Sequence, residues 1–107
     1  MSTFDDREKA YENKYAHDQE LEFKAVARRN KLLGLWAAEL MGMDETASLE
    51  YAKAVVKADF EEAGHEDVFR KVRGDFDARG IEQSDHQIRH KMEQLLEEAR
   101  LQVREQS

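Results

Sequence analysis

The chain has 107 residues, no cysteine, no proline and a formal net charge of −7 at pH 7. This length suffices for one domain with a modest hydrophobic core, and the lack of cysteine excludes disulfides and thiolate chemistry. No stretch approaches the roughly 18 apolar residues of a membrane-spanning helix. The acidic N-terminal segment lacks the apolar core of a signal peptide, so we expect a cytoplasmic protein. The net negative charge argues against a dedicated nucleic-acid binder.

The first predicted helix runs from Thr3 to Met41, contains one glycine, Gly34, and ends before Gly42, which suits the residue after a helix. Thr3 with Asp6 resembles a capping box at its start. Its second half has an apolar stripe: Phe23, Val26, Ala27, Leu33, Ala37, Leu40 and Met41, widened by Leu32 and Trp36. Such a helix would be about 60 Å long, whereas a compact chain of this size is only about 30–35 Å across. Its first half therefore cannot pack on its own domain.

Three shorter helices follow, so the predicted fold is all-α, a four-helix bundle with an N-terminal arm continuous with the first helix. The second begins after Asp44 as N-cap and runs to about Glu62, before Gly64, with the stripe Leu49, Ala52, Val55, Val56 and Phe60. The third spans about Glu66 to Ala78, before Gly80, with Val68, Phe69, Val72 and Phe76 facing inward. The fourth opens with a Ser84–Gln87 capping box and has the stripe Ile88, Met92, Leu95, Leu96, Ala99 and Val103.

Residues 1–22 form a separate arm, and residues 23–107 form the bundle. The arm contains seven acidic and three basic residues, and Phe4, Tyr11 and Tyr15 fall within about 40° of one another on a helix. That line is too narrow to hold the arm on a core, and an isolated helix of this length is marginal in water. We expect an arm that is mobile, disordered or fraying when free, and helical when bound to a partner. The alternative is a solvated helix extension with incidental aromatic residues.

A basic ridge directly follows the acidic arm. Lys24, Arg28 and Lys31 lie within about 60° on one helix face, with Arg29 to one side. Such a ridge could bind a phosphate or an acidic partner surface. The alternative is an ordinary exposed face with pairs such as Glu20–Lys24.

No motif predicts catalysis or a metal site. Glu62 and His65 match half of a di-iron motif, but Gly64 lies between them and the second half is missing. His86 and His90 are four residues apart, and two ligands alone make a weak site. We therefore expect neither an enzyme nor a metalloprotein.

Several strings resemble the zeta (ζ) inhibitor subunit family of α-proteobacterial F-type ATP synthases. They are Thr3-Phe4-Asp5-Asp6-Arg7-Glu8, Ala16-His17-Asp18, Phe23-Lys24-Ala25, Ala27-Arg28-Arg29-Asn30, Leu32-Leu33-Gly34, Trp36-Ala37-Ala38, Asp59-Phe60-Glu61 and Glu66-Asp67-Val68-Phe69-Arg70-Lys71. The resemblance covers most of the chain in order, and the last helix resembles the family in pattern only.

The resemblance implies an inhibitor of ATP hydrolysis whose N-terminal arm enters the catalytic sector between catalytic and non-catalytic subunits, near the rotor, and blocks hydrolytic rotation. The expected partner-binding residues are Phe4, Asp5, Asp6, Arg7, Glu8, Tyr11, Lys14 and Tyr15. The family also implies weak ADP or ATP binding at an unknown site, with no other cofactor. We expect a protein that is monomeric when free, is not membrane-inserted, and lies peripherally at the inner membrane through ATP synthase. The alternative is a small adenine-nucleotide-responsive binding module without inhibitory activity.

Overall fold

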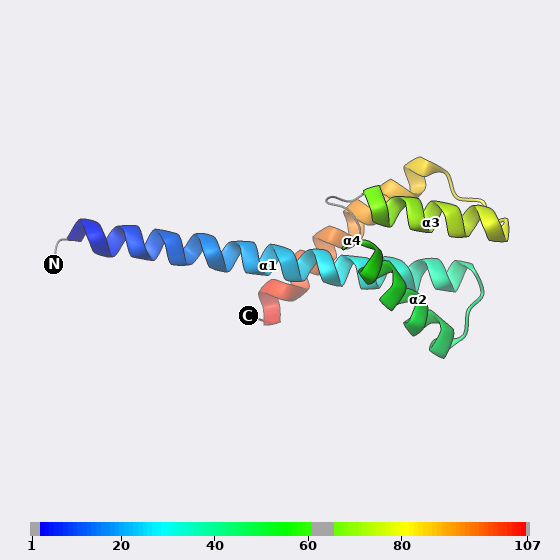
Figure 1. Ribbon diagram of the computed structural model, residues 1–107, viewed down its shortest axis with the longest axis horizontal. Coiled ribbons are helices and arrows are strands. Elements are labelled where there is room, and N and C mark those ends of the chain that lie inside the picture. Colours follow the sequence, from blue (N-terminus) through cyan, green and yellow to red (C-terminus); the bar gives the residue numbers. More distant parts are fainter. Residues whose placement is uncertain (1–2, 61–65, 107) are drawn as a thin grey trace.

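The computed structural model describes residues 3–60 and 66–106, without the side chains of residues 3–16. This part of the chain forms four helices in the order α1 (Thr3–Leu40), α2 (Glu45–Ala58), α3 (Glu66–Arg79) and α4 (Asp85–Gln106). The molecule is elongated, with principal extents of 64 × 24 × 22 Å. Figure 1 shows the reason: α2, α3 and α4 gather around the C-terminal half of α1, and the N-terminal half of α1 extends beyond them. The predicted all-α four-helix fold is confirmed.

The helix ends follow the local chemistry of the sequence. Gly42 has a φ of 73°, and its N–H donates to the Glu39 carbonyl while the Met43 N–H donates to the Ala38 carbonyl, both at 3.0 Å. Only glycine adopts this left-handed conformation without strain, so α1 stops there. Gly80, with a φ of 70°, stops α3 in the same way. Thr3 is already helical, and its predicted capping box with Asp6 involves side chains outside the described part.

The predicted N-terminal caps of α2 and α4 are present. The Asp44 carboxylate accepts a hydrogen bond from the Ala47 N–H at 2.8 Å. At the start of α4 the Gln87 N–H donates to the Ser84 hydroxyl at 3.0 Å, and the Ser84 N–H donates to the Gln87 side chain at 2.8 Å. Each cap satisfies backbone donors that a helix start leaves unpaired.

One hydrophobic core joins the four helices. Its fully buried members include Leu33 and Ala37 of α1, Val55 of α2, Val68, Val72 and Phe76 of α3, and Ile88 of α4. The Trp36 ring meets the Phe76 ring edge to face, with centroids 5.7 Å apart. A smaller cluster, Ala25 with Ala99 and Val103, packs the end of α4 onto α1. The stripes predicted for α3 and α4 are confirmed, except that Leu96 is only partly buried.

The stripes predicted for α1 and α2 are partly wrong. Phe23, Leu40, Leu49 and Phe60 were expected to face inward, yet they are 64, 39, 45 and 71 % exposed. The buried rows of α1 consist instead of small or polar residues: Ala25, Arg29, Asn30, Gly34, Ala37 and Ala38, together with Leu33. In α2, which ends at Ala58 rather than near Glu62, Ala58 is buried in place of Phe60.

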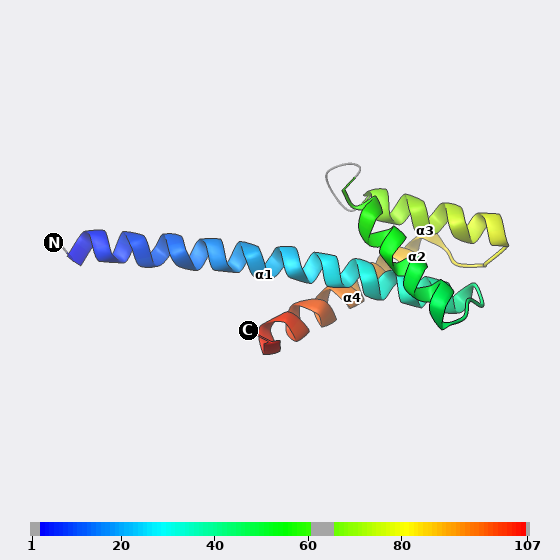
Figure 2. The ribbon, with the colours of Figure 1, turned by 60° about the horizontal axis from the view of Figure 1, so that its bottom comes forward.

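Small residues are buried at Gly34 and Ala52 because α1 and α2 cross closely there. A Cβ added at Gly34 would lie 2.6 Å from the Cα of Ala52 and 3.3 Å from a methyl of Val55. Large apolar side chains at this crossing would hold the helices apart, so they lie at its edges instead. Figure 2 shows α2 crossing the C-terminal half of α1. The end predicted for the second helix, at Glu61, Glu62 and Gly64, lies outside the described residues.

Candidate functional site

The candidate arm is the N-terminal half of α1. The backbone of α1 is helical from Thr3, and the turns that carry Phe4 to Tyr15 lie beyond the other three helices (Figure 2). The side chains of all eight predicted partner-binding residues lie outside the described part, so their roles stay predictions. The first four residues whose side chains are described, His17, Asp18, Gln19 and Glu20, are exposed.

The base of the arm is held by α4. The Arg100 guanidinium binds the Glu22 carboxylate, with its closest nitrogen at 2.7 Å, and Glu97 on its own helix at 2.8 Å. Its hydrogen bond to Glu22, with the nearby negative charges, raises the pKa of Arg100. Nearly two helical turns further along α1, the Arg28 guanidinium donates to Gln102 at 3.3 Å and to Gln106 at 2.7 Å. The contacts between α1 and α4 join residues more than 70 positions apart, which no local pattern could have revealed.

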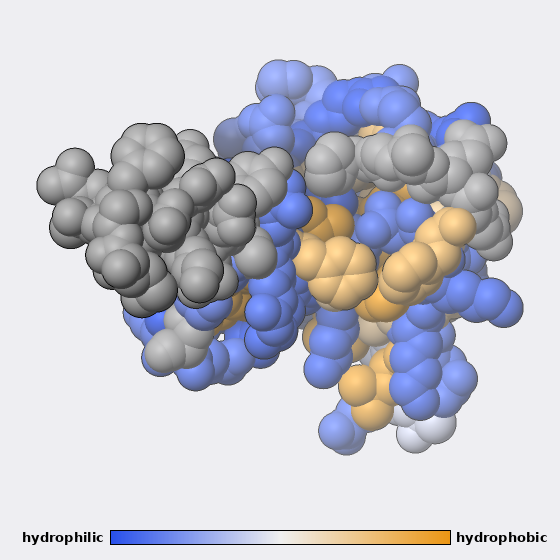
Figure 3. All heavy atoms as spheres, turned by 60° about the vertical axis from the view of Figure 1, so that its left-hand side comes forward, coloured by the Kyte–Doolittle hydropathy of each residue, from blue (hydrophilic) through white to orange (hydrophobic). Residues whose placement is uncertain are grey.

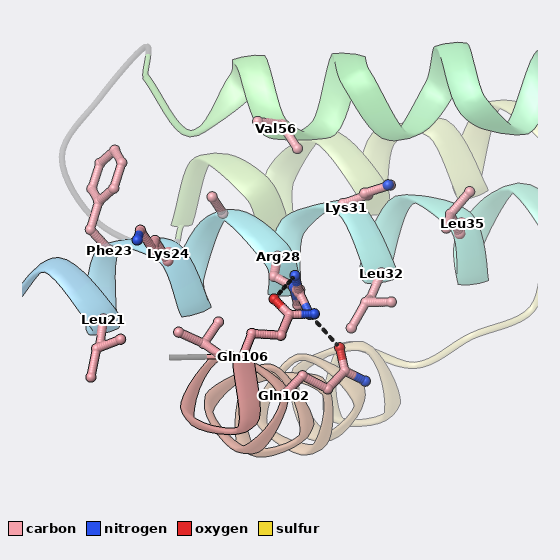
Figure 4. Close-up of a pocket in the computed structure, with 12 residues that line it drawn as sticks. Leu21, Phe23, Lys24, Arg28, Lys31, Leu32, Leu35, Val56, Gln102 and Gln106 are labelled. Carbon is pink, nitrogen blue, oxygen red and sulfur yellow. Dashed lines mark hydrogen bonds between the residues drawn. The ribbon is translucent and has the colours of Figure 1, made fainter.

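The predicted basic ridge lines a groove. Lys24, Arg28 and Lys31 lie along a hollow of about 750 Å³ on the face of α1 between α2 and α4 (Figure 4). Its other lining residues are Leu21, Phe23, Ala27, Leu32, Leu35, Val56, Gln102, Val103 and Gln106. We refer to this hollow as the basic groove. Lys24 and Lys31 are exposed, and Lys24 also makes the predicted ion pair with Glu20, at 3.3 Å.

An apolar patch adjoins the basic groove. Phe23 and Phe60 are the two most exposed large apolar side chains described. They line a small hollow whose other lining residues are Val26, Ala27, Asn30, Val56 and Asp59. Figure 3, seen from the side of the arm, shows apolar surface gathered on the bundle amid charged surface. Phe23, Ala27 and Val56 also line the basic groove, so the two surfaces are continuous.

Arg29 does not belong to the ridge. It is only 2 % exposed, and its Nε donates to the side-chain oxygen of the fully buried Asn30 at 2.8 Å. Burial lowers the pKa of Arg29, and the negative charge of Asp59 opposes that shift. The second arginine of the Arg-Arg pair is thus part of the interior, whereas Arg28 is at the surface.

The predicted histidine pair on α4 and the Glu62–His65 pair are the two candidate metal ligand sets. The His86 and His90 rings stack with centroids 6.3 Å apart, and no group of three or more potential ligands occurs among the side chains that the structure describes, those of residues 17–60 and 66–106. Glu62 and His65 lie outside these ranges. No helix among the described residues is long and apolar enough to cross a membrane.

These features define an all-α bundle that extends one charged helix beyond its own core and carries a basic groove beside it. The chain belongs to the family described as ATPase inhibitor subunit zeta, which matches residues 1–102. It is also similar to a protein whose solution NMR structure is known: the two are 49 % identical, and the match covers 81 % of this chain and 99 % of the other with a TM-score of 0.71. None of the curated proteins matches the chain. The resemblance read from the sequence is confirmed, and the family is regulatory rather than catalytic, with an ATP synthase as its partner.

Proposed function

We propose that this protein inhibits ATP hydrolysis by an F-type ATP synthase by inserting the N-terminal half of α1 into the catalytic sector, where it blocks rotation in the hydrolytic direction. The arm would lie between catalytic and non-catalytic subunits near the rotor, with the bundle outside. Such a protein works in the cytoplasm, peripherally at the inner membrane through ATP synthase.

One observation supports this mechanism above the others: α1 continues as a helix well beyond the helices that cover it. Its extending half has an aromatic line and alternating charges, which suit a helix that binds in a groove. Phe4, Tyr11 and Tyr15 would be the apolar anchors, and Asp5, Asp6, Arg7, Glu8 and Lys14 the charged contacts. The Glu22–Arg100 pair would hold the base of the arm while its tip binds.

The test is ATP hydrolysis by inhibitor-free ATPase from the same source. The intact protein should inhibit, and a form lacking residues 1–18 should not. Tyr11→Ala should weaken inhibition about 30-fold or more if this residue is a buried anchor worth about 2 kcal/mol. Leu101→Ala, at a 58 % exposed position on α4, is the matched control and should inhibit normally. An intact protein without effect on hydrolysis would rule out the inhibitor function, and equal inhibition by the truncated form would rule out the arm as its effector.

A second candidate function rests on the basic groove. Three cations beside apolar side chains suit a nucleotide, so the chain could act as an adenine-nucleotide-responsive module. ADP should then shift the amide resonances of Lys24 to Lys31. An absence of shifts at millimolar ADP would reject this candidate.

A further inference from the structure

The basic groove combines apolar surface with charge of one sign. Seven apolar residues line it together with Lys24, Arg28 and Lys31, and no acidic residue is among the described residues that line it. Glu20 neutralises only Lys24, from outside the groove. A suitable occupant therefore has apolar side chains and carboxylates within the same short segment.

The arm has this composition. Residues 1–22 have a net charge of −4 and include Phe4, Tyr11 and Tyr15. The helical rise puts Phe4 about 17 Å from Tyr15, and it puts Leu21 about 21 Å from Leu35 along the groove. The aromatic line is thus about as long as the groove. Tyrosine rings also bind lysine and arginine cations through their faces.

The arm cannot reach the groove of its own chain. Both belong to α1, which is one continuous helix from Thr3 to Leu40, so the arm extends away along the axis on which the groove lies. We propose that the basic groove binds the arm of a second copy of this chain. This proposal rests on charge, length and geometry, and it is independent of ATPase inhibition.

The geometry also decides the type of assembly. At 100° per residue, the aromatic line and the basic ridge lie on nearly opposite faces of α1, about 150° apart. One straight helix cannot present both faces to a single partner helix. The association is therefore head to tail and open-ended, and the average mass rises with concentration without a plateau at the dimer. At low concentration the protein is monomeric, because a few exposed ion pairs and one narrow apolar line bind weakly.

Paramagnetic broadening between two copies tests the contact directly. The chain has no cysteine, so Ala10→Cys creates a unique site for a spin label on the arm. This labelled protein is mixed at low salt with ¹⁵N-labelled protein that has no spin label. Amides of residues 24–35 and 102–106 should broaden, and those of residues 85–90 at the far end of α4 should not. Broadening absent from the groove, or spread evenly over the surface, would overturn the proposal.

Sedimentation measures the same association with matched charge variants. Lys24→Glu, Arg28→Glu and Lys31→Glu together change the net charge to −13, as do Lys53→Glu, Lys57→Glu and Arg79→Glu, which reverse exposed cations outside the groove. The groove variant should associate at least about tenfold more weakly than the control variant, since three attractive pairs become repulsive. Circular dichroism verifies that both variants are folded.

Equal association of the two variants would overturn the proposal. The proposal would also be wrong if the wild-type protein does not self-associate and the groove variant no longer inhibits the ATPase. The basic groove would then bind a surface of the ATPase. Groove resonances that shift with ADP but never broaden with a second copy would likewise assign the groove to a nucleotide.

Discussion

The close crossing of α1 and α2 at Gly34 gives the sharpest prediction about stability. In Gly34→Ala the new Cβ would lie 2.6 Å from the Cα of Ala52, whereas ordinary contact begins at 3.4 Å, so the helices must separate by about 0.8 Å. A backbone atom cannot rotate away, and the shift would loosen Val55 and Ala52 against α1. Overpacking of this kind costs about 1–3 kcal/mol, and the better helix propensity of alanine returns about 1 kcal/mol. We expect a net loss of about 0–2 kcal/mol.

Gly74→Ala is the matched control. Gly74 lies in α3, is exposed, and has nothing within 4 Å of an added Cβ. Only the propensity gain applies there, so this variant should be more stable by about 0.5–1 kcal/mol. Urea unfolding followed by circular dichroism and Trp36 fluorescence measures both. In thermal unfolding of the same variants, the midpoint temperature should change by about 4–8 °C per kcal/mol in a domain of this size. A Gly34→Ala variant as stable as Gly74→Ala would refute the close crossing.

Three further predictions concern single side chains. Arg29→Ala should lower the free energy of unfolding by about 2–5 kcal/mol, measured by urea unfolding, because it leaves Asn30 unpaired inside the fold and opens a cavity. Arg28→Ala should cost less than about 1 kcal/mol. Equal effects of the two substitutions would contradict the burial of Arg29. Ser84→Ala should cost about 1 kcal/mol through the lost cap of α4, and an unchanged midpoint would show that the reciprocal hydrogen bonds are unimportant. Burial and the hydrogen bond to Asp75 raise the pKa of Tyr51, so its phenol should remain protonated in an ultraviolet titration after exposed tyrosines ionise near about pH 10. Because this pKa is raised on folding, its contribution to stability is complete below about pH 10 and is lost at higher pH, and Tyr51→Phe should remove that dependence.

The four helices, and their ends apart from the C-terminal end of α2, could be predicted from the sequence because the information is local. A left-handed glycine ends α1 and α3, and one cap residue begins α2 and α4. The stripes of α3 and α4 were also predictable, since those helices bury large apolar residues at helical spacing. The division of the first helix into an acidic, aromatic arm and a basic continuation follows from the order of residues alone, as does the family resemblance that the comparison confirms.

The tertiary structure decided which faces of α1 and α2 are buried. Hydrophobicity favours Phe23 and Phe60 as interior residues, but the close approach at Gly34 and Ala52 admits small side chains and places both phenylalanines outside. The tertiary structure also buries Arg29 and leaves Arg28 at the surface, although the two are adjacent in sequence. The Glu22–Arg100 pair joins residues 78 positions apart. The walls of the basic groove come from three helices, α1, α2 and α4. Sequence spacing carries no trace of such contacts, because they exist only after α4 has packed onto α1.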